Sequence, residues 1–246
     1  MSAVPSKVEE IVCTLRTEIL SGQYRVGERL PSERDLASRF ESNRGGIREV
    51  IKKLEQLGII EVTPGGVRVR PVEEATLEVL GYLLELGEIQ KPDLFAQVLD
   101  VLGAMFSLSV RSAIDRATDE DISEIATIIE GLIESITDDS VEKHHELWMT
   151  LTEKMIAVHQ NLVLKLIGNG LRTRFMAGIN SPDFEPVIDQ EAVRQVLNDL
   201  KNAVEEKNSE LAGRAIIRHF DLMKSGLVDF SEQSADTESQ RRTGHA

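Results

Sequence analysis

Residues 30–69 have the sequence LPSERDLASRFESNRGGIREVIKKLEQLGIIEVTPGGVRV. From Arg44 onward the apolar residues lie three or four positions apart, which predicts a helix with one buried face; they are Ile47, Val50, Ile51, Leu54 and Leu57. Gly58 is expected to end this helix. The β-branched residues after it and the turn at residues 63–66 predict a two-stranded hairpin.

A shorter helix is expected just before this one. Ser32 and Asp35 have the spacing of a capping box, with Asp in place of the usual Glu. Closer to the N-terminus, apolar residues at helical spacing predict an amphipathic helix; they are Val8, Ile11, Val12, Leu15 and Ile19. Three helices and a hairpin need about 65 residues, which suffices for a small domain. Residues 1–70 are therefore predicted to form a winged helix-turn-helix domain.

Basic side chains share one face of the helix that begins at Arg44. Arg44, Arg48 and Lys52 recur every four residues, away from the apolar face. Long basic side chains in this arrangement can reach DNA phosphates from the flanks of a helix and base edges from its first turn. Asn43 is placed to cap the helix. By itself, this row of basic residues is equally compatible with a helix face that is merely exposed to solvent. The neighbouring helix and hairpin favour a recognition helix.

The segments LPSERDLASRF and NRGGIREVIKKLEQLGIIEV and the PGG turn resemble the N-terminal domain of GntR-family transcription regulators, over roughly residues 7 to 70. The resemblance implies DNA contacts from Arg34, Arg44 and Arg48, with Gly65 and Gly66 at the wing tip. Gly45 and Gly46 stand where family members usually carry small hydroxyl residues, so two hydroxyl contacts to phosphate are in question. The predicted DNA-binding residues are Arg34, Asn43, Arg44, Gly45, Gly46, Arg48, Lys52, Gly65 and Gly66.

The charge is distributed unevenly along the chain. The net charge of −14 at first argues against a nucleic-acid binder. Residues 1–70 contain 12 Lys and Arg against 10 Asp and Glu, whereas the other 176 residues contain 16 against 32. The acidic residues therefore lie outside the predicted DNA-binding domain. A strongly anionic second domain is repelled by phosphates, which limits nonspecific binding and turns the basic face toward the duplex.

Length and composition predict a two-domain cytoplasmic protein. The chain has 246 residues, of which 41% are hydrophobic, enough for a second core. We expect no membrane span, because no run of about 18 apolar residues is present, and the N-terminus has no apolar signal core. Cys13 is the only cysteine and is expected to be a buried small hydrophobe on the first helix, so one chain cannot form a disulfide.

The rest of the chain is predicted to be helical, with no strand pattern after residue 70. A linker helix is expected at residues 71–88 and an all-helical effector-binding and dimerisation domain at residues 89–230. The polar residues 231–246 are expected to form a disordered tail. The predicted fold class is mainly α, with an N-terminal winged helix-turn-helix and a C-terminal all-α helical bundle.

A basic DNA-binding domain followed by an all-helical domain resembles the FadR-type arrangement within the GntR family. This resemblance implies an effector-binding domain and a homodimer. Many members of a related branch hold a divalent cation through an acidic residue and three histidines. Leu102 and Phe106 occupy the positions of that branch's pocket arginine and glutamate. Thr152 and Leu197 occupy the positions of two of its histidines, and only His219 matches. We therefore expect no metal and no cofactor.

Replacing charged and ligating groups by Leu and Phe should leave an apolar cavity. The segment LFAQVLDVLGAMFSLSVRSAI resembles the corresponding helix of the fatty-acid-responsive regulators, which implies a fatty acyl-CoA or related lipid as effector. Arg172 and Arg174 are candidate partners for an anionic head group. The alternative is that the apolar residues are plain core and the arginines are solvated. The predicted lining residues are Leu99, Leu102, Met105, Phe106, Trp148 and Met155.

These features together predict a transcriptional regulator of fatty acid metabolism that binds double-stranded DNA as a homodimer. A dimer presents two recognition helices, so the operator should be an inverted repeat. The sequence has no Gly-rich phosphate loop, no catalytic serine motif and no usable histidine cluster, so we expect neither an enzyme nor catalytic residues. Two alternatives stay open: a metal-dependent regulator that responds to a small carboxylate, and an architectural DNA binder without an effector.

Overall fold

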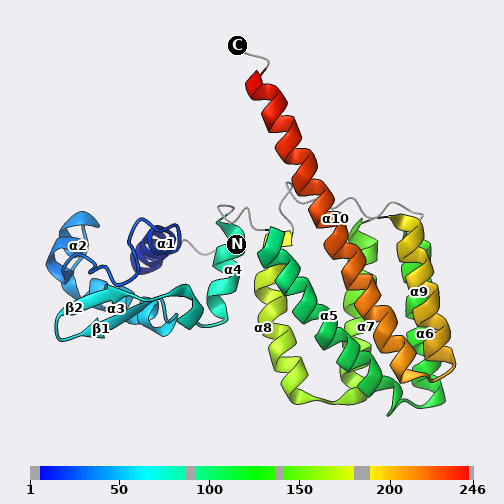
Figure 1. Ribbon diagram of the computed structural model, residues 1–246. Coiled ribbons are helices and arrows are strands. Elements are labelled where there is room, and N and C mark those ends of the chain that lie inside the picture. Colours follow the sequence, from blue (N-terminus) through cyan, green and yellow to red (C-terminus); the bar gives the residue numbers. More distant parts are fainter. Residues whose placement is uncertain (1–5, 87–91, 137–140, 180–188, 244–246) are drawn as a thin grey trace. The chain divides into compact units, whose positions relative to one another are not determined.

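The computed structural model describes residues 6–86, 92–136, 141–179 and 189–243, and is mainly helical (Figure 1). The chain forms two compact units. Unit 1 comprises residues 1–90 and 170–181, and unit 2 comprises residues 91–169 and 182–246.

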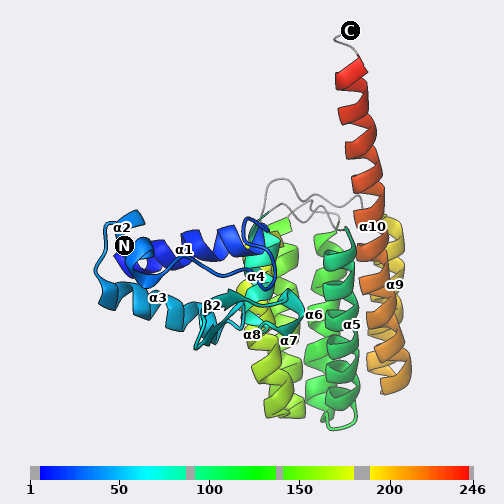
Figure 2. The same cartoon turned by 60° about the vertical axis from the view of Figure 1, so that its left-hand side comes forward.

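Unit 1 has the predicted winged helix-turn-helix order (Figure 2). The two strands pair in antiparallel register, with Ile60 opposite Val69 and Thr63 opposite Gly66. Its elements are α1 (Lys7–Leu20), α2 (Glu33–Arg39), α3 (Arg44–Gln56), β1 (Ile60–Thr63) and β2 (Gly66–Val69).

Side-chain caps fix where the helices of unit 1 begin. The Ser32 hydroxyl accepts the backbone N–H of Asp35 at 3.3 Å, as the capping-box spacing predicts. The Asn43 side chain accepts the N–H of Gly46 at 2.8 Å, which caps α3. After α3, Gly58 adopts a φ of +75°, the left-handed conformation that glycine allows without strain. The predicted helix boundaries are confirmed at these positions.

The segment after the hairpin differs from the expected linker helix of residues 71–88. A short 3₁₀ turn at Val72–Glu74 comes first, and α4 spans only Glu78–Glu85. Val79 of α4 is buried in the same core as α1 and α3, and the Arg16 guanidinium lies 3.3 Å from the centre of the Tyr82 ring. This apolar and cation–π packing makes α4 part of the winged-helix unit.

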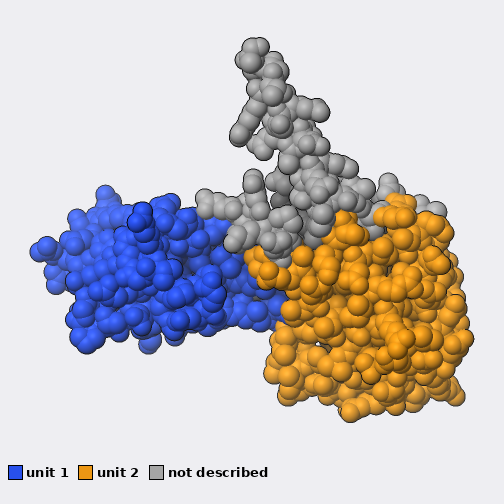
Figure 3. Space-filling view, viewed as in Figure 1, with its two compact units in different colours: residues 1–90, 170–181 blue, residues 91–169, 182–246 orange. Residues whose placement is uncertain are grey.

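Unit 2 is drawn in orange in Figure 3. In this helical unit α10 packs along α5 and α9, while α6 packs against α7 and α9. No strand occurs among its described residues, as predicted. Its helices are α5 (Pro92–Ile114), α6 (Asp119–Ser135), α7 (Val141–His159), α9 (Gln190–Glu205) and α10 (Ser209–Thr243), together with the first part of α8 (Leu162–Ile179), whose residues from 170 onward are grouped with unit 1.

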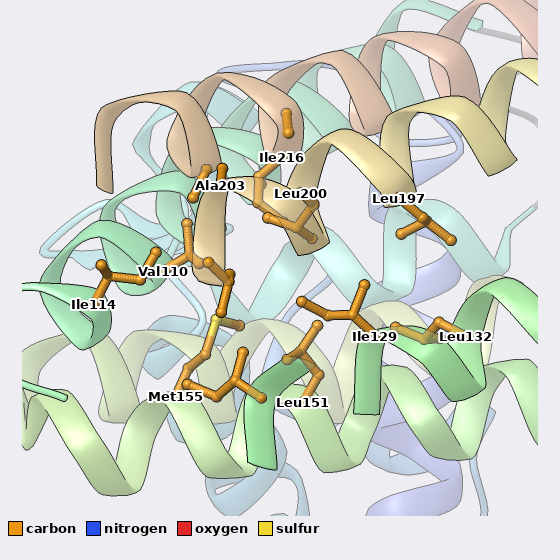
Figure 4. Close-up of a cluster of buried hydrophobic side chains, with 14 of the residues drawn as sticks. Val110, Ile114, Ile129, Leu132, Leu151, Met155, Leu197, Leu200, Ala203 and Ile216 are labelled. Atoms are coloured by element: carbon orange, nitrogen blue, oxygen red, sulfur yellow. The ribbon is translucent and has the colours of Figure 1, made fainter. Parts of the chain in front are cut away.

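Aliphatic side chains from α5, α6, α7, α9 and α10 fill the centre of this body (Figure 4). Their burial supplies the main stabilisation of a bundle, because removing apolar surface from water is worth roughly 25 cal/mol per Å². The residues labelled in the figure are Val110, Ile114, Ile129, Leu132, Leu151, Met155, Leu197, Leu200, Ala203 and Ile216.

The C-terminal stretch differs from the disordered tail expected at residues 231–246. Helix α10 continues as one helix to Thr243, and residues 244–246 lie outside the described part of the chain. Neither Gly nor Pro occurs between residues 227 and 243, so nothing in the sequence interrupts the backbone hydrogen bonds before Gly244.

Two expectations drawn from composition need correction. Cys13 is exposed, not buried, because the inward face of α1 is formed by residues such as Ile11 and Leu15 and leaves position 13 on the outside.

The expectation of no membrane span rested on the lack of a continuous apolar run. By length and composition Leu94–Ile114 could cross a membrane, with a mean hydropathy of 1.4. This helix is α5, which packs along α10 and α7.

Candidate functional site

The cationic face of α3 is open to solvent. Arg44, Arg48 and Lys52 are all exposed, while the apolar residues of the same helix point into the core of unit 1. Arg34, on α2, is also exposed, with 78% of its side chain accessible. The four basic residues predicted to bind DNA are therefore free of the core, as phosphate or base contacts require.

Arg48 is oriented by a carboxylate from the neighbouring helix. Its Nε donates to Glu33 Oε2 at 2.9 Å and to Oε1 at 3.2 Å. Glu33 opens α2, so this pair bridges the two helices of the helix-turn-helix. The sequence did not predict the pair, because the two residues are 15 positions apart and only the fold brings them together.

The first turn of α3 contains the two glycines that depart from the family pattern. Gly45 is exposed and Gly46 is half-buried. A β-carbon at Gly45 would lie 3.1 Å from the Asn43 side-chain oxygen, and one at Gly46 would lie 3.0 Å from the Ser42 hydroxyl. The β-carbon at Gly46 would also lie 3.7 Å from the Asn43 oxygen, so substitutions at either position would crowd the Asn43 cap that starts the recognition helix.

The wing carries basic residues that the sequence interpretation missed. Gly65 is exposed, and Gly66 has a φ of +115° with the Arg29 guanidinium packed against its α-carbon. Arg29 forms an isolated antiparallel bridge to Arg68 of β2, and Arg68 Nη1 donates to the Gly27 carbonyl at 2.8 Å. The alternation of β2 could have identified Arg68 as exposed. Arg29 had no such signal, because its neighbours show no strand pattern.

Four of the predicted effector-lining residues lie on α5. Leu99 is buried, Leu102 and Met105 are half-buried, and Phe106 packs against the core of unit 2. Phe106 also stacks on Phe220, with ring centroids 5.5 Å apart. These residues occupy the inner side of α5, where plain core packing and ligand contact are both compatible with the geometry.

The remaining predicted lining residues come from α7. Met155 is fully buried in the core. Trp148 is half-buried and meets Phe106 edge to face, with centroids 6.4 Å apart. The side chains of Arg172 and Arg174 lie outside the described residues, so the predicted head-group contacts stay predictions.

A chain of hydrogen bonds links Ser135, His144 and Trp148. The Ser135 hydroxyl lies 2.7 Å from both the Leu132 carbonyl and His144 Nδ1. Because a hydroxyl has one proton and donates it to the carbonyl, His144 Nδ1–H donates to Ser135. His144 Nε2 then accepts the indole N–H of Trp148 at 3.0 Å. These hydrogen bonds require His144 to be neutral. Burial lowers the pKa of His144, which favours the neutral form.

His219 of α10 is the buried polar residue at the centre of the cluster. Its ring lies 4.7 Å from the Trp148 ring, and only 5% of the residue is exposed. Burial lowers the pKa of His219 to about 4, so the imidazole is neutral at pH 7. Its Nδ1 is buried without a hydrogen-bond partner among the described residues. Buried polar atoms are normally paired, so this nitrogen can accept or donate one further bond.

Residues 7–69 match the family described as "Bacterial regulatory proteins, gntR family", and residues 97–222, about half of the chain, match the FCD domain. The chain belongs to the GntR family and carries an FCD domain. The expected GntR membership is thereby confirmed. These matches do not distinguish the fatty-acid-responsive branch from the other branches of the family.

The chain is similar to several bacterial regulators. It is 36% identical over 125 residues to "Uncharacterized HTH-type transcriptional regulator Rv0494" of Mycobacterium tuberculosis, covering 50% of each chain. It is 30% identical over 132 residues to the "Galactonate operon transcriptional repressor" of Escherichia coli, covering 52% of this chain and 57% of that one. The chain thus spans about half the length of these two curated relatives.

One solved structure supports the fold of this GntR-family chain. It is described as "Lar controls the expression of the Listeria monocytogenes agr system and mediates virulence", with a TM-score of 0.53 and 16% sequence identity. The similarity covers 93% of this chain and 99% of that one. At this level of identity the similarity shows the fold alone.

The residues of this FCD domain do not fit the metal site of the metal-containing branch. Thr152 donates its hydroxyl proton to the Trp148 carbonyl at 2.8 Å, and Leu197 is fully buried in the core. No group of three or more His, Cys, Asp or Glu residues comes together over the described ranges. His219 alone cannot hold a cation with the usual three or four protein ligands.

Two open hollows lie on the surface of the FCD domain, away from the predicted effector residues. The first, of about 470 Å³, lies between α5 and α10 and is lined by Ser107, Arg111, Glu210, Gly213, Arg214, Ile217 and Arg218. The second lies beside α6 and α9 and includes Lys201 and Glu130. The residues predicted to line the effector site instead contact one another and the core, so a ligand there would have to displace side chains.

Proposed function

We propose that this GntR-family chain is a DNA-binding transcription regulator that acts as a homodimer on an inverted-repeat operator in the cytoplasm. The observation that carries the proposal is the open row of Arg44, Arg48 and Lys52 on α3. Arg44 and Arg48, in the first turns of α3, can reach base edges or phosphates, and Lys52 can bind a phosphate. Arg29 and Arg68 beside the wing extend the basic surface.

The DNA-binding proposal is tested with an operator selected from random duplexes by the purified chain. We expect enrichment of an inverted repeat, since a two-fold dimer presents two identical α3 helices. Affinity for that site should fall steeply with salt, because basic side chains release counterions from phosphates. Recovery of no enriched sequence at moderate salt would contradict specific binding.

We further propose that the FCD domain binds a fatty acyl-CoA or related lipid among α5, α7 and α10. The aromatic cluster of Phe106, Trp148 and His219 supports this ligand class, because it is apolar and the imidazole is neutral. The unpartnered Nδ1 of His219 offers one hydrogen bond to a thioester or carboxyl oxygen. The described residues lack the ligand set that the metal-dependent alternative needs.

Ligand and operator are then coupled through the equilibrium between DNA-competent and DNA-incompetent dimers. A ligand that prefers one arrangement changes operator affinity by the same free energy by which DNA changes ligand affinity. Whether the dimer represses or activates a promoter depends on where its operator lies.

Native mass spectrometry of the protein as purified from cells tests the effector proposal. We expect a co-purifying acyl species and, because Trp148 is the only tryptophan, a change in its fluorescence on titration with long-chain acyl-CoA. A bound metal would instead support the small-carboxylate alternative. If neither an acyl species nor a metal with a small carboxylate changed the operator affinity, the result would support an architectural DNA binder.

A further inference from the structure

A second ion pair of unit 1 joins Glu18 of α1 to Arg39, the last residue of α2. Arg39 Nη1 donates to Glu18 Oε2 at 2.9 Å, and Arg39 Nη2 donates to Glu18 Oε1. Arg39 Nη1 also donates to the Tyr24 hydroxyl at 3.3 Å. Two hydrogen bonds from a planar guanidinium to one carboxylate fix the angle between the two groups as well as their distance. Arg39 therefore holds α2 at one geometry relative to α1 and to the segment that follows α1.

The carboxylate of this pair is enclosed by the protein. Among the residues that the structure describes, Glu18 is the only Asp, Glu, Lys or Arg that is buried. Its side chain is 12% exposed, against 43% for Arg39. Taking a carboxylate out of water costs hydration free energy, and a buried ion pair is often no more stabilising than apolar side chains of the same size. Stability alone does not explain the buried charge, which indicates a role for the geometry that the pair imposes.

Helix α2 is held by ion pairs at both of its ends. It has seven residues, and Leu36 is the only one that is buried. Packing through one buried side chain does not by itself fix the rotation of so short a helix. Glu33, the first residue of α2, pairs with Arg48 of α3. Arg39, the last residue, pairs with Glu18 of α1, so the two pairs together set the orientation of α2 between its neighbours.

The two ion pairs differ in how DNA can affect them. The side chains of Arg48 and Glu33 are 70% and 37% exposed, so a DNA phosphate can compete with the Glu33 carboxylate for the guanidinium. The Glu18 carboxylate is enclosed, and buried charges are screened much less by salt than exposed ones. The pair of Glu18 and Arg39 can therefore keep its geometry while the pair of Glu33 and Arg48 opens on DNA.

We propose that Arg39 is a positioning residue for DNA recognition, which acts through the orientation of α2 and does not contact the duplex. Arg34, which is predicted to bind DNA, lies on α2 next to Glu33, the carboxylate that holds Arg48. A rotation of α2 therefore moves Arg34 and releases Arg48 from its set direction. This inference rests on the proposed function, because it assigns Arg39 a role in DNA binding.

A double substitution in the full chain, Glu18→Leu with Arg39→Met, tests the proposal. It replaces the ion pair by apolar side chains and leaves the net charge unchanged. We expect the unfolding temperature to be no lower than that of the wild type. Affinity for the selected operator should fall by about 10-fold, as for the loss of a base contact. Affinity for nonspecific duplex should stay within about twofold, with the same salt dependence, because no phosphate contact is lost.

Two further variants separate geometry from charge. Arg39→Lys keeps the charge but replaces the planar fork by a single ammonium group, so operator affinity should fall while nonspecific affinity stays unchanged. If the double variant failed to fold, Arg39→Lys would decide the question by the same two affinities. The matched control, Arg70→Gln with Glu74→Gln, removes another ion pair of unit 1 that does not involve α2. Its operator affinity should equal that of the wild type.

Hydrogen exchange provides a readout that distinguishes positioning from general stability. In the double variant the amides of α2 should exchange faster, while those of α1 and α3 keep their wild-type protection. Equal acceleration in all three helices would show a general loss of stability and would overturn a positioning role.

The DNA measurements give the other results that would overturn the proposal. One is an operator bound equally well by the wild type and by Arg39→Lys or the double variant. Another is an equal loss of operator and nonspecific affinity with a salt slope lower by about one contact, which would show that Arg39 itself binds a phosphate. A wild type that enriches no operator would refute the proposed function, and this inference with it.

Discussion

The guanidinium of Arg48 on the recognition helix is held by the carboxylate of Glu33, with 2.9 Å between Arg48 Nε and Glu33 Oε2. The side chains are 70% and 37% exposed, so the pair adds little stability, roughly 0 to 1 kcal/mol. In the proposed DNA interface, the pair fixes the direction of Arg48 and neutralises one of the cations that would meet a phosphate or a base.

Replacement of Arg48 by alanine should weaken binding to the selected operator by about 1 to 3 kcal/mol, the value of a specific base contact. Fluorescence anisotropy at fixed salt measures the change. Lys53→Ala is the control, since Lys53 is half-buried on α3 and pairs with Glu49. Equal affinity of Arg48→Ala and the wild type would remove this residue from the DNA interface.

Glu33→Gln should strengthen binding to nonspecific duplex and make it more dependent on salt. The substitution keeps the size of the side chain and releases the Arg48 charge, which adds about one phosphate contact to the slope of log affinity against log salt. Titrations at several salt concentrations give this slope. An unchanged slope would mean that the ion pair persists in the complex and serves only to orient Arg48.

The wing turn provides a matched pair of glycine substitutions. Gly66→Ala should lower the unfolding free energy of unit 1 by about 1 to 3 kcal/mol, because a φ of +115° is strained for any residue with a β-carbon. Gly65→Ala should have little effect, since its nearest neighbour would be 3.7 Å away. Hydrogen exchange of the α3 amides reports the stability of this unit. Equal protection in the two variants would contradict a requirement for glycine at position 66.

The elements of unit 1 could be predicted because their signals are local. Helical spacing fixed the buried side of α3, and Ser32, Asn43 and Gly58 fixed helix ends through contacts within a few residues. Arg29 was missed because its role depends on backbone pairing between residues 27–30 and β2, a contact between segments about 40 positions apart.

The candidate effector site depends even more on contacts between segments that are distant in the sequence. Apolar spacing identified Phe106 and Trp148, but the polar chain that links Ser135, His144 and Trp148 requires α6 and α7 to be packed at one particular register. His219 was recognised only through a family position. Its burial and its unpartnered nitrogen come from the surrounding helices, which no pattern within α10 could reveal.

The buried imidazole of His219 makes the stability of unit 2 depend on pH. Its pKa is about 4 in the folded chain, against 6.5 for an ordinary histidine, so between these values the unfolded chain binds a proton that the folded chain does not. The stability gained by keeping His219 neutral is complete above pH 6.5 and is lost as the pH falls toward 4. From pH 6 to pH 5 the loss should be about 1.2 kcal/mol for this one group.

Urea unfolding followed by Trp148 fluorescence at pH 7.5, 6 and 5 measures this loss, because the only tryptophan lies in contact with the histidine. His219→Phe should reduce the dependence on pH without abolishing it, since burial also lowers the pKa of His144. If His219→Phe and the wild type lost stability equally between pH 6 and pH 5, the imidazole would already be protonated in the folded chain, and the neutral, apolar character proposed for the effector site would have to be abandoned.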